Sequence, residues 1–326
     1  MKRIRWIDIA KGLGIVLVVL GHCQIPNTVL RIITAFHMPL FFFLAGYTYS
    51  PEKYSLPDFC KSRMKTIVWP YLFFTALSVL ASFGRKLVGQ DTSLAIIFDS
   101  FISMGFVESN PPLWFLRSLF VVEILFCLYQ RVHKKHWLAL LGVYFIMILA
   151  FALNWRFYMR SVNGFVFYGL GYAMKELRVM DHVKRHKFPV CIVSAMIFAG
   201  TWMYASADFS ITTNSNLIAF VVITHAGILG MIALSMCLES MKLQIFDYLG
   251  KNSLVILCTH ILVKDVISVL LKLILKNSTF MDEVSMEFAV LTTVAICIGS
   301  CVTAEIINRF FPFVIGKHYK HARISS

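Results

Sequence analysis

Three ionisable side chains stand out in the first apolar stretch of the chain. Residues 6–24 read WIDIAKGLGIVLVVLGHCQ and include Asp8, Lys11 and His22. Ionisable groups within a membrane span are costly and mark functional sites by default. On an α-helix, eleven residues advance close to three whole turns and about 16 Å, so Lys11 and His22 share one face. Neutral imidazole is suited to proton abstraction near pH 7, which makes His22 a candidate general base.

The same residues can also be explained by structural roles without chemistry. Lys11 can extend its stem to the inner headgroups, and His22 can form a hydrogen bond at the outer interface. A second histidine, His37, begins the next apolar stretch, FHMPLFFFLAGYTY. We expect it to approach His22 across a short loop and to position the base or its substrate. Two histidines also suit a metal, but no carboxylate or thiolate is spaced to complete such a site, so we expect none.

Further polar residues enter the third and fourth stretches. Arg63 and Lys65 precede WPYLFF. The forked guanidinium of arginine and the point charge of lysine are both suited to binding phosphate groups. The positive-inside bias of membrane proteins explains such residues equally well. The fourth stretch, NPPLWFLRSLFVVEILF, carries Trp114, Arg117 and Glu123. Trp114 is also compatible with an interfacial aromatic belt. Glu123 has no partner nearby in the sequence, so it needs company from another helix.

The stretch GKNSLVILCTHILVKDV contributes one more polar stripe. Ser253, His260 and Lys264 fall near one helical face by i+7 and i+4 spacing. Together with the earlier residues, this gives a basic cluster at the inner end, an imidazole pair at the outer end and a polar route between them. That arrangement suits a reaction joining a cytoplasmic anionic donor to an acceptor on or near the other side.

The elements that must position these residues are membrane helices. The chain has 326 residues, of which 58% are hydrophobic and 15% charged, with a mean hydropathy of +0.74. Its apolar blocks have the length of about 17 to 25 residues that a helix needs to cross a bilayer. We predict an all-α polytopic transmembrane bundle, a single membrane-embedded domain over residues 1–326. Its expected spans, about ten, are 7–24, 29–49, 65–84, 112–130, 137–153, 162–176, 189–206, 217–239, 252–275 and 286–311.

Charge and cysteine usage narrow the classes further. Lysine and arginine concentrate in alternate connecting segments, which predicts an even span count with both termini cytoplasmic. The net charge of +14 then mainly reflects basic residues in the cytoplasmic connecting segments. No soluble domain is expected to carry a nucleic-acid-binding face. The eight cysteines are scattered without CxxC spacing, so neither a disulfide framework nor a zinc site is indicated.

Four segments, in order, resemble a known family. RIRWIDIAKGLGIVLVVLGH, FHMPLFFFLAGYTY, NPPLWFLRSLF and LVILCTHILV are similar to hallmark segments of the acyltransferase-3 family of integral-membrane acyltransferases. The branch with fucose 4-O-acetylase-like sugar O-acetyltransferases is the most similar. The resemblance spans essentially the whole chain. It implies a multi-pass protein of the inner (cytoplasmic) membrane that transfers an acyl group, usually acetyl, from acyl-coenzyme A to a hydroxyl of a surface glycan or its lipid-linked precursor.

The resemblance also implies roles for individual residues. His22 and His37 are expected to be catalytic, without a metal, either by direct base catalysis or through an acyl-histidine. Arg117 departs from the family, where many relatives have proline, and Lys11 replaces the commoner arginine. Asp8, Glu123 and Ser253 are expected to support the site. The residues expected to bind donor or acceptor are Lys11, Arg63, Lys65, Trp114, Arg117 and His260.

Two other classes of function stay open on the sequence alone. A proton-coupled transporter or flippase of a glycan or small anionic solute would also place ionisable groups such as Lys11, His22 and Glu123 within its spans. A polysaccharide-binding or sensor protein would tolerate loss of His22. The expected partners of the acyltransferase are acyl-coenzyme A, the glycan acceptor and the lipid bilayer.

Overall fold

The computed structural model describes residues 3–50, 55–87, 109–132, 159–204, 217–241, 243–275 and 285–317, and the single positions 142, 145 and 149. Within these ranges every regular element is helical, as the sequence predicts. The α-helices are α1 Arg5–Gly21, α2 Asn27–Thr34, α3 His37–Thr48, α4 Leu56–Arg63, α5 Trp69–Leu87, α7 Trp114–Val132, α9 Met159–Glu176, α10 Val179–Arg185, α11 Lys187–Thr201, α12 Leu217–Leu238, α13 Gln244–Lys251, α14 Ser253–Leu275 and α15 Met286–Phe310.

Six helical segments are long and apolar enough to cross a membrane, and each coincides with a predicted span. They are Asn27–Thr48, Leu56–Phe83, Pro111–Arg131, Ile218–Met241, Ser253–Leu271 and Met286–Phe310. The chain is thus a multi-pass membrane protein. Helices α1, α9 and α11 lie where three further spans are predicted, but α1 and α11 are shorter. The span predicted at 137–153 falls almost entirely outside the described residues, and the total of ten stays a prediction.

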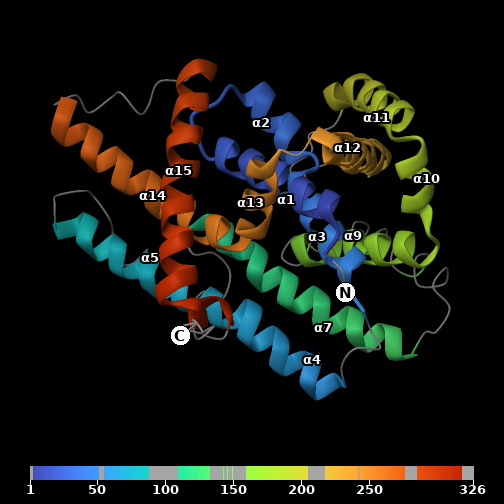
Figure 1. The fold of residues 1–326 in the computed structure, drawn as a ribbon, viewed down its shortest axis with the longest axis horizontal. Helices are drawn as coiled ribbons and strands as arrows, with labels where there is room; N and C mark the ends of the chain where they lie inside the picture. Colours follow the sequence, from blue (N-terminus) through green and yellow to red (C-terminus); the bar gives the residue numbers. More distant parts are fainter. Residues whose placement is uncertain are drawn as a thin grey trace, which may run out of the picture.

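Helix α1 occupies the middle of the molecule (Figure 1). It packs against α3, α12, α13, α14 and α15. Its contact with α13 is unusually close, because Gly12 faces the backbone of Phe246 and Gly250 faces the backbone of Asp8. A Cβ atom at either glycine would overlap the facing carbonyl group. Small residues allow this kind of backbone approach between helices.

A second close contact joins α3 to α9. Helix α3 is apolar on every side, and its Phe42 and Phe43 side chains are fully buried. Gly46 lies against the carbonyl of Tyr168, and Gly171 lies against the carbonyl of Phe43. These two glycines allow α3 and α9 to pack closely together. Because α3 is apolar on every side, it is buried inside the bundle.

The second predicted span is not one continuous helix. It is divided into α2 and α3, and Phe36 at the junction has φ −143° and ψ −17°. His37 is therefore the first residue of α3, and Pro39 is the third. A missing backbone N–H costs little in the first turn of a helix, where that group has no partner. The break places His37 at the start of α3, inside the candidate span Asn27–Thr48.

The third predicted span also contains an irregular turn. Helices α4 and α5 are joined by a π-helical segment, Met64–Val68, which begins directly after Arg63. Pro70 cannot donate a hydrogen bond to the carbonyl of Thr66, and its ring crowds that carbonyl. A wider turn before the proline relieves this crowding, and such π turns are frequent at functional sites.

Candidate active site

The end of α1 carries His22, and α14 holds that end in place. His22 is the residue that caps α1, with φ −100° and ψ 2°. The last carbonyl groups of a helix lack partners within the helix. Lys264 of α14 fills this role, because its ammonium group donates a hydrogen bond to the carbonyl of His22. A cation at a helix C-terminus is also favoured by the helix dipole.

The imidazole of His22 lies against a second imidazole. Its ring centroid is 5.2 Å from that of His260, with the ring planes tilted by 45°. His260 is only 1% exposed, whereas His22 is half-buried. His37 lies within electrostatic range of His22, and its Nδ1 is 2.7 Å from the carbonyl oxygen of Ile33. We call His22, His37, His260 and Lys264 the histidine cluster.

A second group, which we call the charged cluster, consists of Lys11, Arg63 and Glu123. Arg63 Nε and Glu123 Oε2 are 3.0 Å apart and form an ion pair, although the two atoms are not aligned for a hydrogen bond. Lys11 also interacts electrostatically with Glu123. Glu123 is 4% exposed. The carboxylate that lacked a partner in the sequence thus has cations from α1 and α4.

The two basic residues predicted to act together have different surroundings. Arg63 is half-buried and its guanidinium also lies 4.8 Å from the centre of the Phe59 ring. Lys65, within the π-helical segment, is exposed. Asp8 is buried and pairs with Arg3, which leaves Lys11 next to a carboxylate that already has a partner.

The chain segment after α15 folds back on this end of the molecule. Gly316 has φ +69° and lies against the backbone of Lys65. Lys317 donates a hydrogen bond to Asn308 at 2.8 Å. Burial lowers the pKa of Lys317, and the nearby Arg3 lowers it further. Arg3 interacts electrostatically with both Lys11 and Lys317, so further basic groups lie at this end of the molecule.

Trp114 begins α7 and stacks with a cation from α9. The guanidinium carbon of Arg160 lies 4.9 Å from the centre of a Trp114 ring. Arg117, one turn later, is half-buried. Ser253 begins α14, about 10 Å along the helix from His260, so the structure does not bring it to the histidine cluster.

Sequence reasoning missed one residue that holds this region together, Asn110, and it missed the contact that Lys264 makes. Asn110 is fully buried and donates hydrogen bonds to Ser78 Oγ at 3.1 Å and to the carbonyl of Cys258 at 2.8 Å. It thereby fixes α14 two residues before His260. The sequence feature that could have indicated Asn110 is its position directly before two prolines at the start of a helix. Lys264 was visible as part of the α14 stripe, but its bond to the end of α1 has no counterpart in the sequence pattern.

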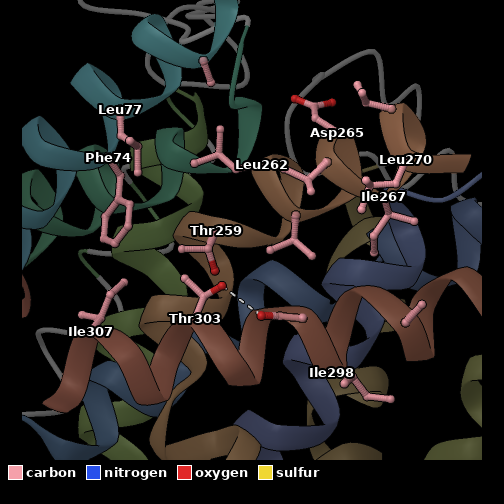
Figure 2. A pocket seen from close by; sticks show the side chains of 16 residues that line it. Phe74, Leu77, Thr259, Leu262, Asp265, Ile267, Leu270, Ile298, Thr303 and Ile307 are labelled. Atoms are coloured by element: carbon pink, nitrogen blue, oxygen red, sulfur yellow. Dashed lines mark hydrogen bonds between the residues drawn. The ribbon is translucent and has the colours of Figure 1, made fainter. Parts of the chain in front are cut away.

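A groove between α5, α14 and α15 has a different character (Figure 2). It has a volume of about 1010 Å³, and none of the predicted site residues lines it. Its threonine hydroxyls are already satisfied, since Thr259 donates to Val255 and Thr303 donates to Gly299. The groove therefore offers mainly hydrocarbon surface. Among the described residues no group of three or more His, Cys, Asp or Glu side chains is arranged to hold a metal ion.

A multi-pass helical bundle with histidines and paired charges inside it defines a class of membrane protein rather than one activity. The family is decided by comparison: the acyltransferase-3 model (Acyl_transf_3), described as an acyltransferase domain, matches residues 4–305. The chain belongs to this acyltransferase family, as its four segments predict. No curated protein and no solved structure matches the chain. The fucose 4-O-acetylase-like branch is not distinguished by these findings.

Proposed function

We propose that this membrane acyltransferase moves an acyl group, most simply acetyl, from acyl-coenzyme A to a hydroxyl of a cell-surface glycan or its lipid-linked precursor. We place it in the inner membrane, with both termini cytoplasmic. The observation that carries the proposal is the pair of imidazoles, His22 and His260, held together where α1 meets α14. An acyl transfer to a hydroxyl needs a base at this kind of position.

The charged cluster supports a cytoplasmic anionic donor. Lys11 and Arg63 carry two positive charges against the single carboxylate of Glu123. The exposed Lys65 adds another positive charge in the segment that follows Arg63. Phosphate groups of coenzyme A suit such a net basic region. By helical rise, Lys11 and His22 are about 16 Å apart, comparable to the reach of an extended pantetheine arm.

The transfer step uses His22 as the base in the direct form of the mechanism. A lone pair of its imidazole takes the proton of the acceptor hydroxyl. The hydroxyl oxygen then bonds to the thioester carbonyl carbon, and the bond from carbon to sulfur breaks. The proton passes from His22 to the thiolate of coenzyme A, which leaves as a thiol. In the other form, His22 attacks the thioester first and passes the acyl group on.

The experiment is acyl transfer in membranes that contain the protein. Radiolabelled acetyl-coenzyme A is added from the cytoplasmic side, and label is counted in the glycan and lipid fractions. Mass spectrometry of the surface glycan, with and without the protein, identifies the modified hydroxyl. We expect label incorporation that depends on the protein. Uptake or flipping of a solute without any label incorporation or thiol release would identify a transporter instead.

A further inference from the structure

We propose that His260 is a positioning residue for His22. In this arrangement, Nε2 of His260 accepts a hydrogen bond from one ring nitrogen of His22 and leaves the other ring nitrogen as the base. The inference rests on the proposed function, because it assigns a tautomer to the catalytic imidazole. Sequence reasoning placed His260 among substrate-binding residues, and in the structure its ring lies beside the ring of His22.

The tautomer of His260 follows from its backbone contact. Its Nδ1 lies 2.9 Å from the carbonyl oxygen of Ile256. A carbonyl oxygen can only accept, so Nδ1 must carry the hydrogen. A neutral imidazole has one such hydrogen, and Nε2 is then a lone-pair acceptor. Nε2 is buried and has no hydrogen-bond partner among the described residues.

The ring of His22 is placed to satisfy that acceptor. Buried polar atoms nearly always have a partner, and an orphaned one calls for an explanation. The two ring centroids are 5.2 Å apart, and the planes are tilted rather than stacked. The torsion that turns an imidazole is broad and soft, so a modest rotation of His22 directs its N–H at His260. His22 is half-buried at the end of α1, and it follows the last residue of the helix.

The neighbouring groups fit this assignment. Lys264 holds the carbonyl of His22 and, as an ammonium, offers donors and no acceptor. It fixes the backbone of His22 while His260 fixes the ring. Asn110 holds the carbonyl of Cys258, which keeps the turn of α14 before His260 in place. The same logic of an outer partner fixing a histidine tautomer operates at metal sites, where its loss costs about 10- to 100-fold.

The first test compares three variants in the labelled-acetyl assay. We expect His260→Leu to lower kcat by about 10- to 100-fold with little change in the KM for acetyl-coenzyme A. His260→Gln, which keeps an acceptor at the end of the side chain, should recover much of that loss. The matched control is His225→Leu, because Nδ1 of His225 makes the same backbone contact, 2.6 Å from the carbonyl of Val221, but its ring lies against Phe167. It should retain near-normal kcat.

The second test is a double-mutant cycle with His22→Ala. If His260 acts through His22, adding His260→Leu to His22→Ala causes no further loss of transfer. Losses that multiply, or equal damage by Leu and Gln at position 260, overturn the positioning role. Each variant is compared at equal amounts of monodisperse protein, so that misfolding is not counted as lost catalysis. If the wild-type protein transfers no acyl group, the proposed function fails. If the wild-type protein is active and His260→Leu is equally active, the positioning role of His260 fails and the proposed function stands.

Discussion

His22 contributes to the structure through its backbone and to the proposed chemistry through its ring. Lys264 binds the carbonyl oxygen of His22, so the join between α1 and α14 does not depend on the imidazole. We therefore expect His22→Ala to insert and fold normally. Acyl transfer should fall by about 10²- to 10⁴-fold, the usual contribution of general acid–base catalysis. The labelled-acetyl assay measures this loss, and near-normal transfer in the variant would rule out His22 as the base.

Removing one partner of the buried ion pair between Arg63 and Glu123 should destabilise the protein more than replacing both partners. Glu123 faces two cations, so Glu123→Gln removes the counter-charge of Arg63 and one of the two carboxylates near Lys11. Breaking a buried pair by removing one partner costs about 3–5 kcal/mol. We expect a clear fall in the thermal unfolding midpoint in detergent. Adding Arg63→Met to Glu123→Gln should restore part of it, whereas an equal or deeper fall in the double variant would show that the loss does not come from an unpaired Arg63 charge.

Lys65 allows donor binding to be tested apart from stability. It is exposed and forms no ion pair with another described residue, so Lys65→Ala should leave the unfolding midpoint unchanged. A charge-assisted contact to phosphate is worth about 1.5–3 kcal/mol, which corresponds to a rise in KM for acyl-coenzyme A of about ten-fold or more. Lys61→Ala, exposed on the preceding helix, is the control. If the KM for acyl-coenzyme A is unchanged in the Lys65 variant, Lys65 does not bind the donor and contributes only to the positive-inside distribution of charge.

At the scale of elements, hydropathy predicted where most helices lie but not how they break. The second span was predicted from its average apolar character, and that average does not mark the break at Phe36, although α2 is amphipathic and α3 is apolar on every side. Helical periodicity placed Lys11 with His22 on one face of α1, and Ser253 with His260 on one stripe of α14. Periodicity describes one helix at a time, and so it could not predict that His260 faces His22.

The close approach of α1 and α13 yields a prediction about glycine. At Gly250, a Cβ atom would overlap the backbone of Asp8, so Gly250→Ala must push α13 away from α1. At Gly200 in α11, a Cβ atom would meet nothing within 4 Å. Alanine is favoured over glycine within helices by about 1 kcal/mol, so Gly200→Ala should be neutral or stabilising. Thermal unfolding in detergent should show opposite behaviour of the two variants; a harmless Gly250→Ala would exclude the tight contact.

At the scale of the whole molecule, the distribution of basic residues predicts orientation. Tags placed within 175–187, between α9 and α11, should be accessible from the cytoplasm. Tags within 207–216, which lies outside the described residues, should be accessible from the other side. Cysteine labelling with a membrane-impermeant reagent distinguishes the two. A cytoplasmic signal from 207–216 would overturn the ten-span topology and the side assigned to the donor.

The bond between Lys264 and His22 joins positions that are 242 residues apart in the chain. During synthesis, α1 enters the membrane long before α14 exists. Until α14 arrives, the end of α1 lacks its ammonium partner, and His22 lacks the neighbouring ring of His260. A nascent chain therefore holds an incomplete site until α14 has been made. Products truncated before α14 are expected to occupy the membrane without consuming acyl donor.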